Sequence, residues 1–186
     1  MKILITGNPT YAIGSALNTV LTGHELKFVG KRTSGIDLND LATMDKFAIF
    51  SLDYDVFINN SRLDNFSQSI LFNKVYNTWL QNKKLGHIIN VGSTGDSGRD
   101  KQWLYGPEKV ALRKATEQAT YTSVFKQSGI KATYLAMGWV STPLVEKHEP
   151  NVKKHTPEEV AKIIKWILDY PIDSTNINEI RIEPIH

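Results

Sequence analysis

Strand-like and helix-like stretches alternate along almost the whole chain of 186 residues, and this alternation limits the fold more than any other feature. Short apolar runs predict strands at Lys2–Thr6, Glu25–Gly30, Ile36–Leu38, Val56–Asn60, His87–Val91, Lys131–Ala136 and Glu179–Glu183. The stretches between them predict helices at about Gly14–Thr22, Leu41–Phe50, Asp64–Lys83, Glu108–Gln127 and Pro157–Leu168. Such alternation implies right-handed crossovers between parallel strands. The predicted fold class is α/β: a Rossmann-type, doubly wound parallel sheet of about seven strands with helices on both faces.

Composition favours one domain and excludes several kinds of protein. A chain of this length with 41% hydrophobic residues can form a single domain, 1–186, with a substantial core. It has no cysteine and its five histidines show no metal-ligand spacing, so we expect neither disulfides nor a metal site. The apolar start is only a strand long, and no apolar run approaches the ~20 residues that span a bilayer. We therefore expect a cytoplasmic protein without a membrane segment.

The net charge of +3 does not indicate nucleic-acid binding, because the basic residues are scattered. A basic stripe interleaved with aromatic residues is missing from the sequence. We expect a small-molecule ligand instead, and an anionic cofactor could use part of the positive charge.

Tyr105 and Lys109 form the only Tyr-x-x-x-Lys pattern in the chain. On a helix, residues four apart share a face, so the Lys109 ammonium can approach the Tyr105 hydroxyl. A free phenol has a pKa of about 10, and a nearby cation favours its ionised form. Tyr105 is therefore a candidate general acid/base near neutral pH. Ser93, twelve residues upstream, would hold a substrate oxygen by a hydrogen bond.

An ordered set of motifs around this trio resembles the short-chain dehydrogenase/reductase family, whose marks are TGxxxGxG, NNAG, a Ser before YxxxK, and PGxVxT. The counterparts here are Thr6–Gly14, Asn59–Arg62, Ser93 with Tyr105 and Lys109, and Gly138–Thr142. The resemblance implies hydride transfer between a nicotinamide cofactor and a carbonyl or alcohol substrate. Tyr105 would be the general acid/base, Lys109 would also bind the nicotinamide ribose, and Ser93 would position the substrate oxygen.

The first loop departs from the family pattern. Gly7 and Gly14 are kept, but the loop is one residue longer, Ala12 stands in place of the middle glycine, and Pro9 has no N–H to donate. A Gly-rich loop of this kind places a pyrophosphate on a helix N-terminus. With the resemblance, the expected cofactor-binding residues are Gly7, Asn8, Tyr11, Ala12, Ile13, Lys31, Arg32, Thr33, Asp37, Leu38, Asn60, Ser61, Tyr105, Lys109, Gly138, Val140 and Thr142.

The end of the second predicted strand favours NADP(H) over NAD(H). Folds that select NAD usually place an acidic residue there, where it binds the ribose 2′-hydroxyl. Val29–Ser34 contains no acid, and Arg32 could clamp a 2′-phosphate with two hydrogen bonds, assisted by Thr33, Ser34 or Lys31. The resemblance places Asp37 and Leu38 at the adenine.

Asn65 is the expected fourth catalytic residue. The family uses an asparagine on the helix after NNAG, whose backbone carbonyl orders a water beside the lysine. Asn65 lies at about the right distance before Ser93, and Asn73 is the competing candidate. Arg62, where the family has glycine, adds bulk and charge near the cofactor.

The resemblance also implies a homodimer or homotetramer, with a self-complementary interface between helices. The helices expected there carry Ile70, Leu71, Val75, Trp79, Val110 and Ala119. Two other functions stay open on the same fold. One is a non-catalytic NADP-binding sensor or regulatory protein, and the other is an isomerase or epimerase that retains its cofactor.

Overall fold

Six parallel strands form one sheet in the computed structural model, which describes residues 1–97, 104–170 and 173–185. The strands are β1 (Lys2–Thr6), β2 (Glu25–Val29), β3 (Val56–Asn59), β4 (Gly86–Val91), β5 (Ile130–Met137) and β6 (Glu179–Ile182). They lie in the order β2-β1-β3-β4-β5-β6, and every neighbouring pair is parallel. The predicted Rossmann-type sheet is confirmed, and the direction of winding reverses between β1 and β3.

The prediction of a seventh strand at Ile36–Leu38 is wrong for the described residues. The Asp37 carboxylate accepts hydrogen bonds from Lys31 Nζ at 2.8 Å and from the Asn39 N–H at 3.1 Å. An aspartate that bonds the backbone two residues on favours a turn over an extended strand. The segment therefore passes the edge of the sheet as irregular chain, with Leu38 buried in the core.

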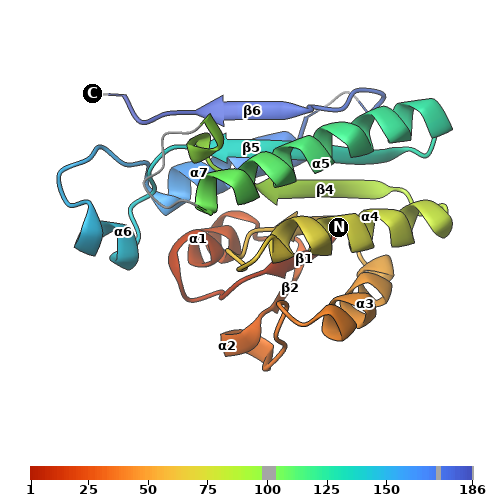
Figure 1. Cartoon of the computed structure of the whole chain (residues 1–186), viewed down its shortest axis with the longest axis horizontal. Coiled ribbons are helices and arrows are strands. Elements are labelled where there is room, and N and C mark those ends of the chain that lie inside the picture. Colours follow the sequence, from red (N-terminus) through yellow and green to blue (C-terminus); the bar gives the residue numbers. More distant parts are fainter. Residues whose placement is uncertain (98–103, 171–172, 186) are drawn as a thin grey trace.

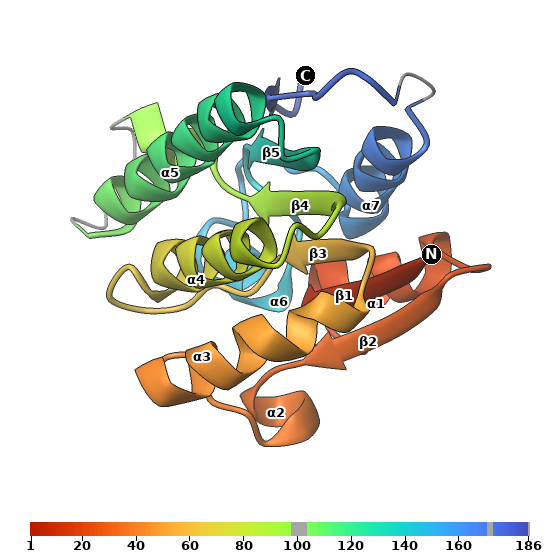
Figure 2. The same ribbon diagram turned by 90° about the vertical axis from the view of Figure 1, so that its right-hand side faces the viewer.

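Helices cover both faces of the sheet, as Figure 2 shows. The helices are α1 (Ala12–Val20), α2 (Lys31–Ser34), α3 (Leu41–Phe50), α4 (Ser67–Gln81), α5 (Tyr105–Lys126), α6 (Pro143–His148) and α7 (Pro157–Leu168). Helices α3, α4 and α5 pack on one face, and α1 and α7 pack on the other. The short helices α2 and α6 were not predicted.

Alternating residues of each strand supply a separate core on each face, because successive side chains point in opposite directions. In β1, Leu4 enters the core under α3, α4 and α5, whereas Ile3 and Ile5 enter the core under α1 and α7. A parallel sheet covered on both faces has strands that are apolar throughout. This explains why Ile3, Leu4 and Ile5 are all apolar, instead of apolar and polar residues alternating along the strand.

The apolar residues expected at an oligomer interface are mostly part of this chain's own core. Leu71, Val75 and Trp79 are fully buried, and Ala119 is 4% exposed. They face the sheet from α4 and α5, so these four side chains are not available for an interface. The exposed apolar side chains of α5 lie near its end instead, at Tyr121, Val124 and Phe125.

Helix starts differ from the prediction at the two places that matter for the site. Helix α4 begins at Ser67 rather than Asp64, because Asn65 and Phe66 have φ of 53° and 62°, in the left-handed region. Helix α5 begins at Tyr105 itself, so Tyr105 and Lys109 share its first turns.

Candidate functional site

A cleft of about 470 Å³ lies at the carboxyl ends of β1, β2 and β3, next to the point where the winding reverses. In Figure 1 the arrowheads of β4 and β6 point to one end of the sheet, where α6 also lies. Doubly wound sheets bind ligands at this position. Residues predicted to bind a cofactor that line the cleft are Gly7, Asn8, Tyr11, Ala12, Ile13, Lys31, Arg32, Thr33, Asp37, Leu38, Asn60, Ser61 and Thr142.

The first loop folds tightly against the start of α1. A Cβ on Gly14 would lie 2.2 Å from the backbone oxygen of Asn8, so only glycine allows this close approach. Gly7 has φ 137°, and a Cβ there would lie 2.8 Å from Asn60 Nδ2. Ala12, which replaces a glycine of the family pattern, has φ 47° and is conformationally strained.

The N-terminus of α1 faces the cleft without a side-chain cap. Tyr11 is the N-cap residue and makes no capping hydrogen bond, and no acidic residue lies in the first turn. The first intrahelical hydrogen bond runs from the Ser15 N–H to the Tyr11 oxygen, so the amides of Ala12, Ile13 and Gly14 precede it. Such a terminus suits an anion.

The side chain of Asn8 is used inside the loop. Its Oδ1 accepts hydrogen bonds from the Thr10 N–H at 2.9 Å and from the Thr10 hydroxyl at 2.8 Å. These two hydrogen bonds fix the turn around Pro9, and Asn8 is one of the residues that line the cleft.

The basic turn after β2 forms the opposite wall of the cleft. Thr33 donates its hydroxyl to the Gly7 oxygen at 2.9 Å, which ties α2 to the first loop. Lys31 forms an exposed ion pair with Asp37 at 2.8 Å. Arg32 is exposed and lines the cleft. Of these side chains, Arg32 is thus the cation best placed for an anionic group in the cleft.

Thr6 joins the end of β1 to Asn60 and Ser61, which follow β3 and line the cleft. Its hydroxyl accepts hydrogen bonds from the N–H groups of Asn60 at 2.9 Å and Ser61 at 3.0 Å. Asn60 also donates its side-chain amide to the Thr6 carbonyl at 3.1 Å. Thr6 is fully buried, so these hydrogen bonds are shielded from water.

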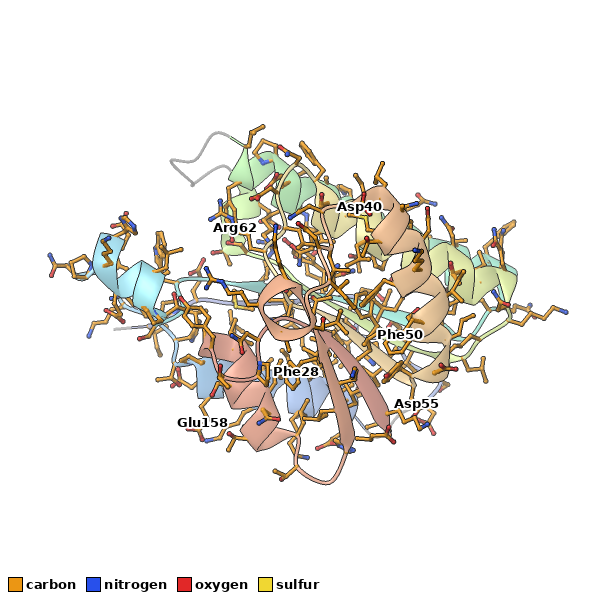
Figure 3. All side chains as sticks on the ribbon, turned by 90° about the horizontal axis from the view of Figure 1, so that it is seen from below. Phe28, Asp40, Phe50, Asp55, Arg62 and Glu158 are labelled. Carbon is orange, nitrogen blue, oxygen red and sulfur yellow. The ribbon has the colours of Figure 1, made fainter. Side chains whose placement is uncertain are left out.

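Two cations lie close to the Tyr105 ring. Lys109 Nζ is 5.4 Å from the centroid of the Tyr105 ring, and Arg62 Cζ is 5.1 Å from it. Arg62 also lines the cleft, and Figure 3 labels its side chain near the start of α5. The predicted pair of Tyr105 and Lys109 is therefore brought together, and Arg62 adds a second positive charge beside the ring.

Lys109 is almost completely buried, with 6% of the residue exposed. Burial, with a smaller contribution from the positive charge of Arg62, lowers the pKa of Lys109 to about 8, while Glu108 opposes this shift. The ammonium donates to the Gln68 side-chain oxygen at 2.6 Å. The acceptor for this buried cation is thus a neutral amide on the first turn of α4.

Ser93 and Lys109 share a contact with the Tyr134 hydroxyl. That hydroxyl lies 3.3 Å from the Ser93 N–H, which donates to it, and 3.3 Å from the Lys109 carbonyl, which accepts from it. Burial raises the pKa of Tyr134, so it stays a neutral donor. The Ser93 hydroxyl accepts from the Gly95 N–H at 3.1 Å. Ser93 is therefore held at the end of β4, next to the helix that carries Tyr105 and Lys109.

Several predicted site residues lie elsewhere. Gly138 packs against the C-terminal segment, since a Cβ on it would lie 2.3 Å from Glu183 Oε2. Val140 is buried and pairs with His155, and neither Gly138 nor Val140 is among the residues that line the cleft. Asn65 is exposed before α4, and Asn73 is exposed on that helix. The side chain that contacts Lys109 is that of Gln68.

No family model matches the chain. The chain is 28% identical over 102 residues to an uncharacterised oxidoreductase of Staphylococcus aureus strain MW2, a match that covers 54% of this chain and 43% of that protein. The matched part thus spans less than half of that relative.

Solved structures match nearly the full length. The 3-alpha-hydroxysteroid dehydrogenase of Pseudomonas sp. B-0831, in complex with NADH, has a TM-score of 0.79 at 16% identity, covering 98% of this chain and 95% of that one. A short chain dehydrogenase/reductase family protein has a TM-score of 0.74 at 18% identity, covering 98% and 95%. The fold is that of a short-chain dehydrogenase/reductase. The closed form of serine dehydrogenase with NADP⁺ has a TM-score of 0.77 at 18% identity, covering 98% and 94%.

Two polar residues beside Lys109 in this short-chain dehydrogenase/reductase fold were missed by the sequence interpretation. Gln68 stands on the face of α4 that also carries Leu71, Val75 and Trp79, and a polar residue on an apolar helix face is a signal that could have revealed it. Tyr134 gave no such signal, because an aromatic residue in a strand is ordinary.

A metal site and a membrane span find no support in residues 1–97, 104–170 and 173–185. No group of three or more metal-ligating side chains occurs among them. Within the same ranges, every helix is too short or too polar to cross a bilayer.

Proposed function

We propose that the chain is an NADP(H)-dependent oxidoreductase of the short-chain dehydrogenase type. The observation that carries this proposal is the placement of Lys109 Nζ 5.4 Å from the Tyr105 ring, at the same end of the sheet as the 470 Å³ cleft. A buried lysine beside a tyrosine is an arrangement suited to proton transfer. The oxidoreductase and dehydrogenase relatives support the same class of reaction.

The residues of the cleft fit a dinucleotide. The uncapped start of α1 suits a pyrophosphate, and the close approach at Gly14 leaves no side chain between loop and helix. Arg32 would bind the 2′-phosphate of NADP(H), and Asp37 and Leu38 would lie at the adenine. Lys109 would bind hydroxyls of the nicotinamide ribose, and Thr142, with Val140 nearby, would hold the carboxamide. When bound, the nicotinamide donates or accepts a hydride.

The proton would be moved by the chain's own side chains. Tyr105 would protonate the carbonyl oxygen during reduction and take the proton back during alcohol oxidation. The charge on Lys109 would lower the pKa of Tyr105, and Arg62 would act in the same direction. Ser93 would hold the substrate oxygen by a hydrogen bond. Fixed orientation of these groups would supply much of the rate acceleration.

A panel of aldehydes and ketones with NADPH tests the proposal. Consumption of NADPH should be followed spectroscopically, with product identified by mass spectrometry. Turnover that depends on a carbonyl substrate would support the reductase function. Product formation without net NADPH consumption would indicate an isomerase or epimerase.

A non-catalytic NADP-binding sensor is the second candidate, and two observations favour it. The Arg62 guanidinium lies over the Tyr105 ring, close to where a substrate would approach, and Ala12 strains the loop at the pyrophosphate position. Tight NADPH binding without turnover of any carbonyl would support this function.

We further propose that the chain forms a homodimer or homotetramer. The apolar surface on α5 supports this, since Tyr121, Val124 and Phe125 are 62%, 73% and 91% exposed. Contiguous exposed apolar side chains often mark an interface. Light scattering of the wild type and of Phe125→Glu tests the proposal: the variant should dissociate, and a wild-type monomer would contradict it.

A further inference from the structure

We propose that Gln68 is a positioning residue for Lys109: its amide oxygen holds the Lys109 ammonium beside the Tyr105 ring and keeps it charged in a buried site. This inference rests on the proposed function, in which Lys109 binds cofactor and tunes Tyr105.

Hydrogen bonds fix the orientation of the Gln68 amide. Its Nε2 donates to the carbonyl of Asn59 at 2.8 Å and to the carbonyl of Val91 at 3.0 Å. Only the NH₂ end of an amide can donate to two carbonyls, so Oε1 must point away from them. It points to Lys109 Nζ, 2.6 Å away. The ends of β3 and β4 thereby determine which atom of Gln68 meets the lysine.

A wider polar network holds Gln68 in place. The Asn59 side chain donates to the backbone oxygen of Gln68 at 3.1 Å and to Asn90 Oδ1 at 2.9 Å. Asn90 in turn donates to the Thr116 hydroxyl on α5 at 2.8 Å. Gln68 is 5% exposed, and Asn59, Asn90 and Thr116 are fully buried, so water cannot replace these bonds easily.

The ammonium needs a hydrogen-bond acceptor because it is buried. Among residues 1–97, 104–170 and 173–185, the charged or titratable groups near it include Arg62 from the loop after β3, Glu108 and Tyr105 on α5, and Tyr134 on β5. Arg62 repels the charge. Glu108 attracts it, but Glu108 Oε1 also accepts the Phe66 N–H at 3.1 Å. The hydrogen bond that Lys109 donates to this neutral amide oxygen favours the protonated form of Lys109 without adding the negative charge of a carboxylate.

Neither asparagine proposed from the sequence has a buried side chain that could contact Lys109 as Gln68 does. Asn65 lies before α4 with an exposed side chain, and Asn73 is exposed on α4. Gln68 occupies the first turn of α4 on the buried face. Lys109 is thus contacted directly by the Gln68 side chain, whereas we expected an asparagine to contact it through a water molecule.

Titration of Lys109 by NMR in protein labelled with ¹³Cε-lysine tests the inference, with the signal assigned through Lys109→Arg. Gln68→Met keeps the length of the side chain and removes its hydrogen bonds, so the pKa of Lys109 should fall by about one to two units. Gln68→Glu places a carboxylate at the same point, so the pKa should rise by about one unit or more. Thr116→Val, the control, breaks the same network at its far end and should leave the pKa of Lys109 unchanged.

Opposite shifts in the two Gln68 variants would support the inference, because a purely structural role would not change sign. An unchanged Lys109 pKa in both would overturn it. If Gln68→Met does not fold, Gln68→Glu decides alone: a rise supports the inference and no change overturns it. The titration needs neither cofactor nor substrate. A protein that binds no NADP(H) would therefore refute the proposed function, while the titration would still decide the role of Gln68.

Discussion

Asp96 and Arg181, on the loop after β4 and on the last strand, form a two-point ion pair. Arg181 Nη1 donates to Asp96 Oδ1 at 2.9 Å and Nη2 donates to Oδ2 at 2.8 Å. The Asp96 side chain is fully buried, and Arg113 on α5 lies 3.6 Å from it. The pair thus fastens the turn Thr94–Ser97, directly after Ser93, to the edge of the sheet.

Arg181→Met should destabilise the protein by about 1.5–3 kcal/mol, because a buried carboxylate loses its charged hydrogen bonds. Glu179→Gln is the matched control: it removes the exposed partner of the same arginine and should cost less than about 1 kcal/mol. Urea denaturation measures both. If both variants lose the same free energy of unfolding, the ion pair between Asp96 and Arg181 does not stabilise the protein more than the exposed pair does.

Ala12→Gly should stabilise the protein by about 0.5–1 kcal/mol, since it removes the strain of a left-handed alanine at some cost in chain entropy. Ala16→Gly, in the interior of α1, is the control and should destabilise by about 1 kcal/mol. Chemical denaturation compares them. A loss of stability in Ala12→Gly equal to that of Ala16→Gly would contradict the strain at Ala12.

Arg32→Ala should weaken NADPH binding by roughly ten- to a hundred-fold and leave NADH binding nearly unchanged. Lys31→Ala should have a smaller effect, because Lys31 is already paired with Asp37. Calorimetric titration with both cofactors measures the difference. If Arg32→Ala weakens both cofactors equally, Arg32 does not bind the 2′-phosphate.

Tyr105→Phe should lower kcat for carbonyl reduction by about 10²–10⁴-fold, since general acid catalysis contributes that much. Folding and cofactor binding should survive, because the ring remains. Tyr121→Phe, a change at an exposed tyrosine of the same helix, is the control and should keep full activity. Lys109→Ala should weaken cofactor binding as well as the rate. Full activity in Tyr105→Phe would exclude it as the proton donor.

His87 should make the protein sensitive to acid. Burial, with a contribution from Lys131, lowers the pKa of His87 from 6.5 to about 4. Between these values the unfolded chain binds the extra proton, so stability should fall as pH drops from 6.5 to 4, by about 3 kcal/mol in total. In His87→Gln, the part of the fall in stability that comes from His87 should disappear. His148 is exposed, so His148→Gln should lose stability with falling pH as the wild type does. Denaturation at several pH values measures the slopes.

The sequence by itself determined the sheet, its parallel strands and most of its helices. In segments such as Lys2–Thr6 and Pro157–Leu168, the spacing of apolar residues predicts a strand or a helix. This works because the buried face or faces of each element must be apolar. The glycines of the first loop could also be identified from the sequence. Gly7 has a positive φ and Gly14 approaches the backbone closely, and other residues do not fit either position.

Only the tertiary structure decided which side chains meet at the site. The contact between Gln68 and Lys109 joins residues 41 positions apart, and the pair of Asp96 and Arg181 spans 85 positions. The prediction of a strand at Ile36–Leu38 was wrong for a local reason instead, since the Asp37 carboxylate accepts the Asn39 N–H in a turn. Such long-range contacts depend on how the helices pack on the sheet and on which polar groups become buried. A local sequence pattern does not predict either.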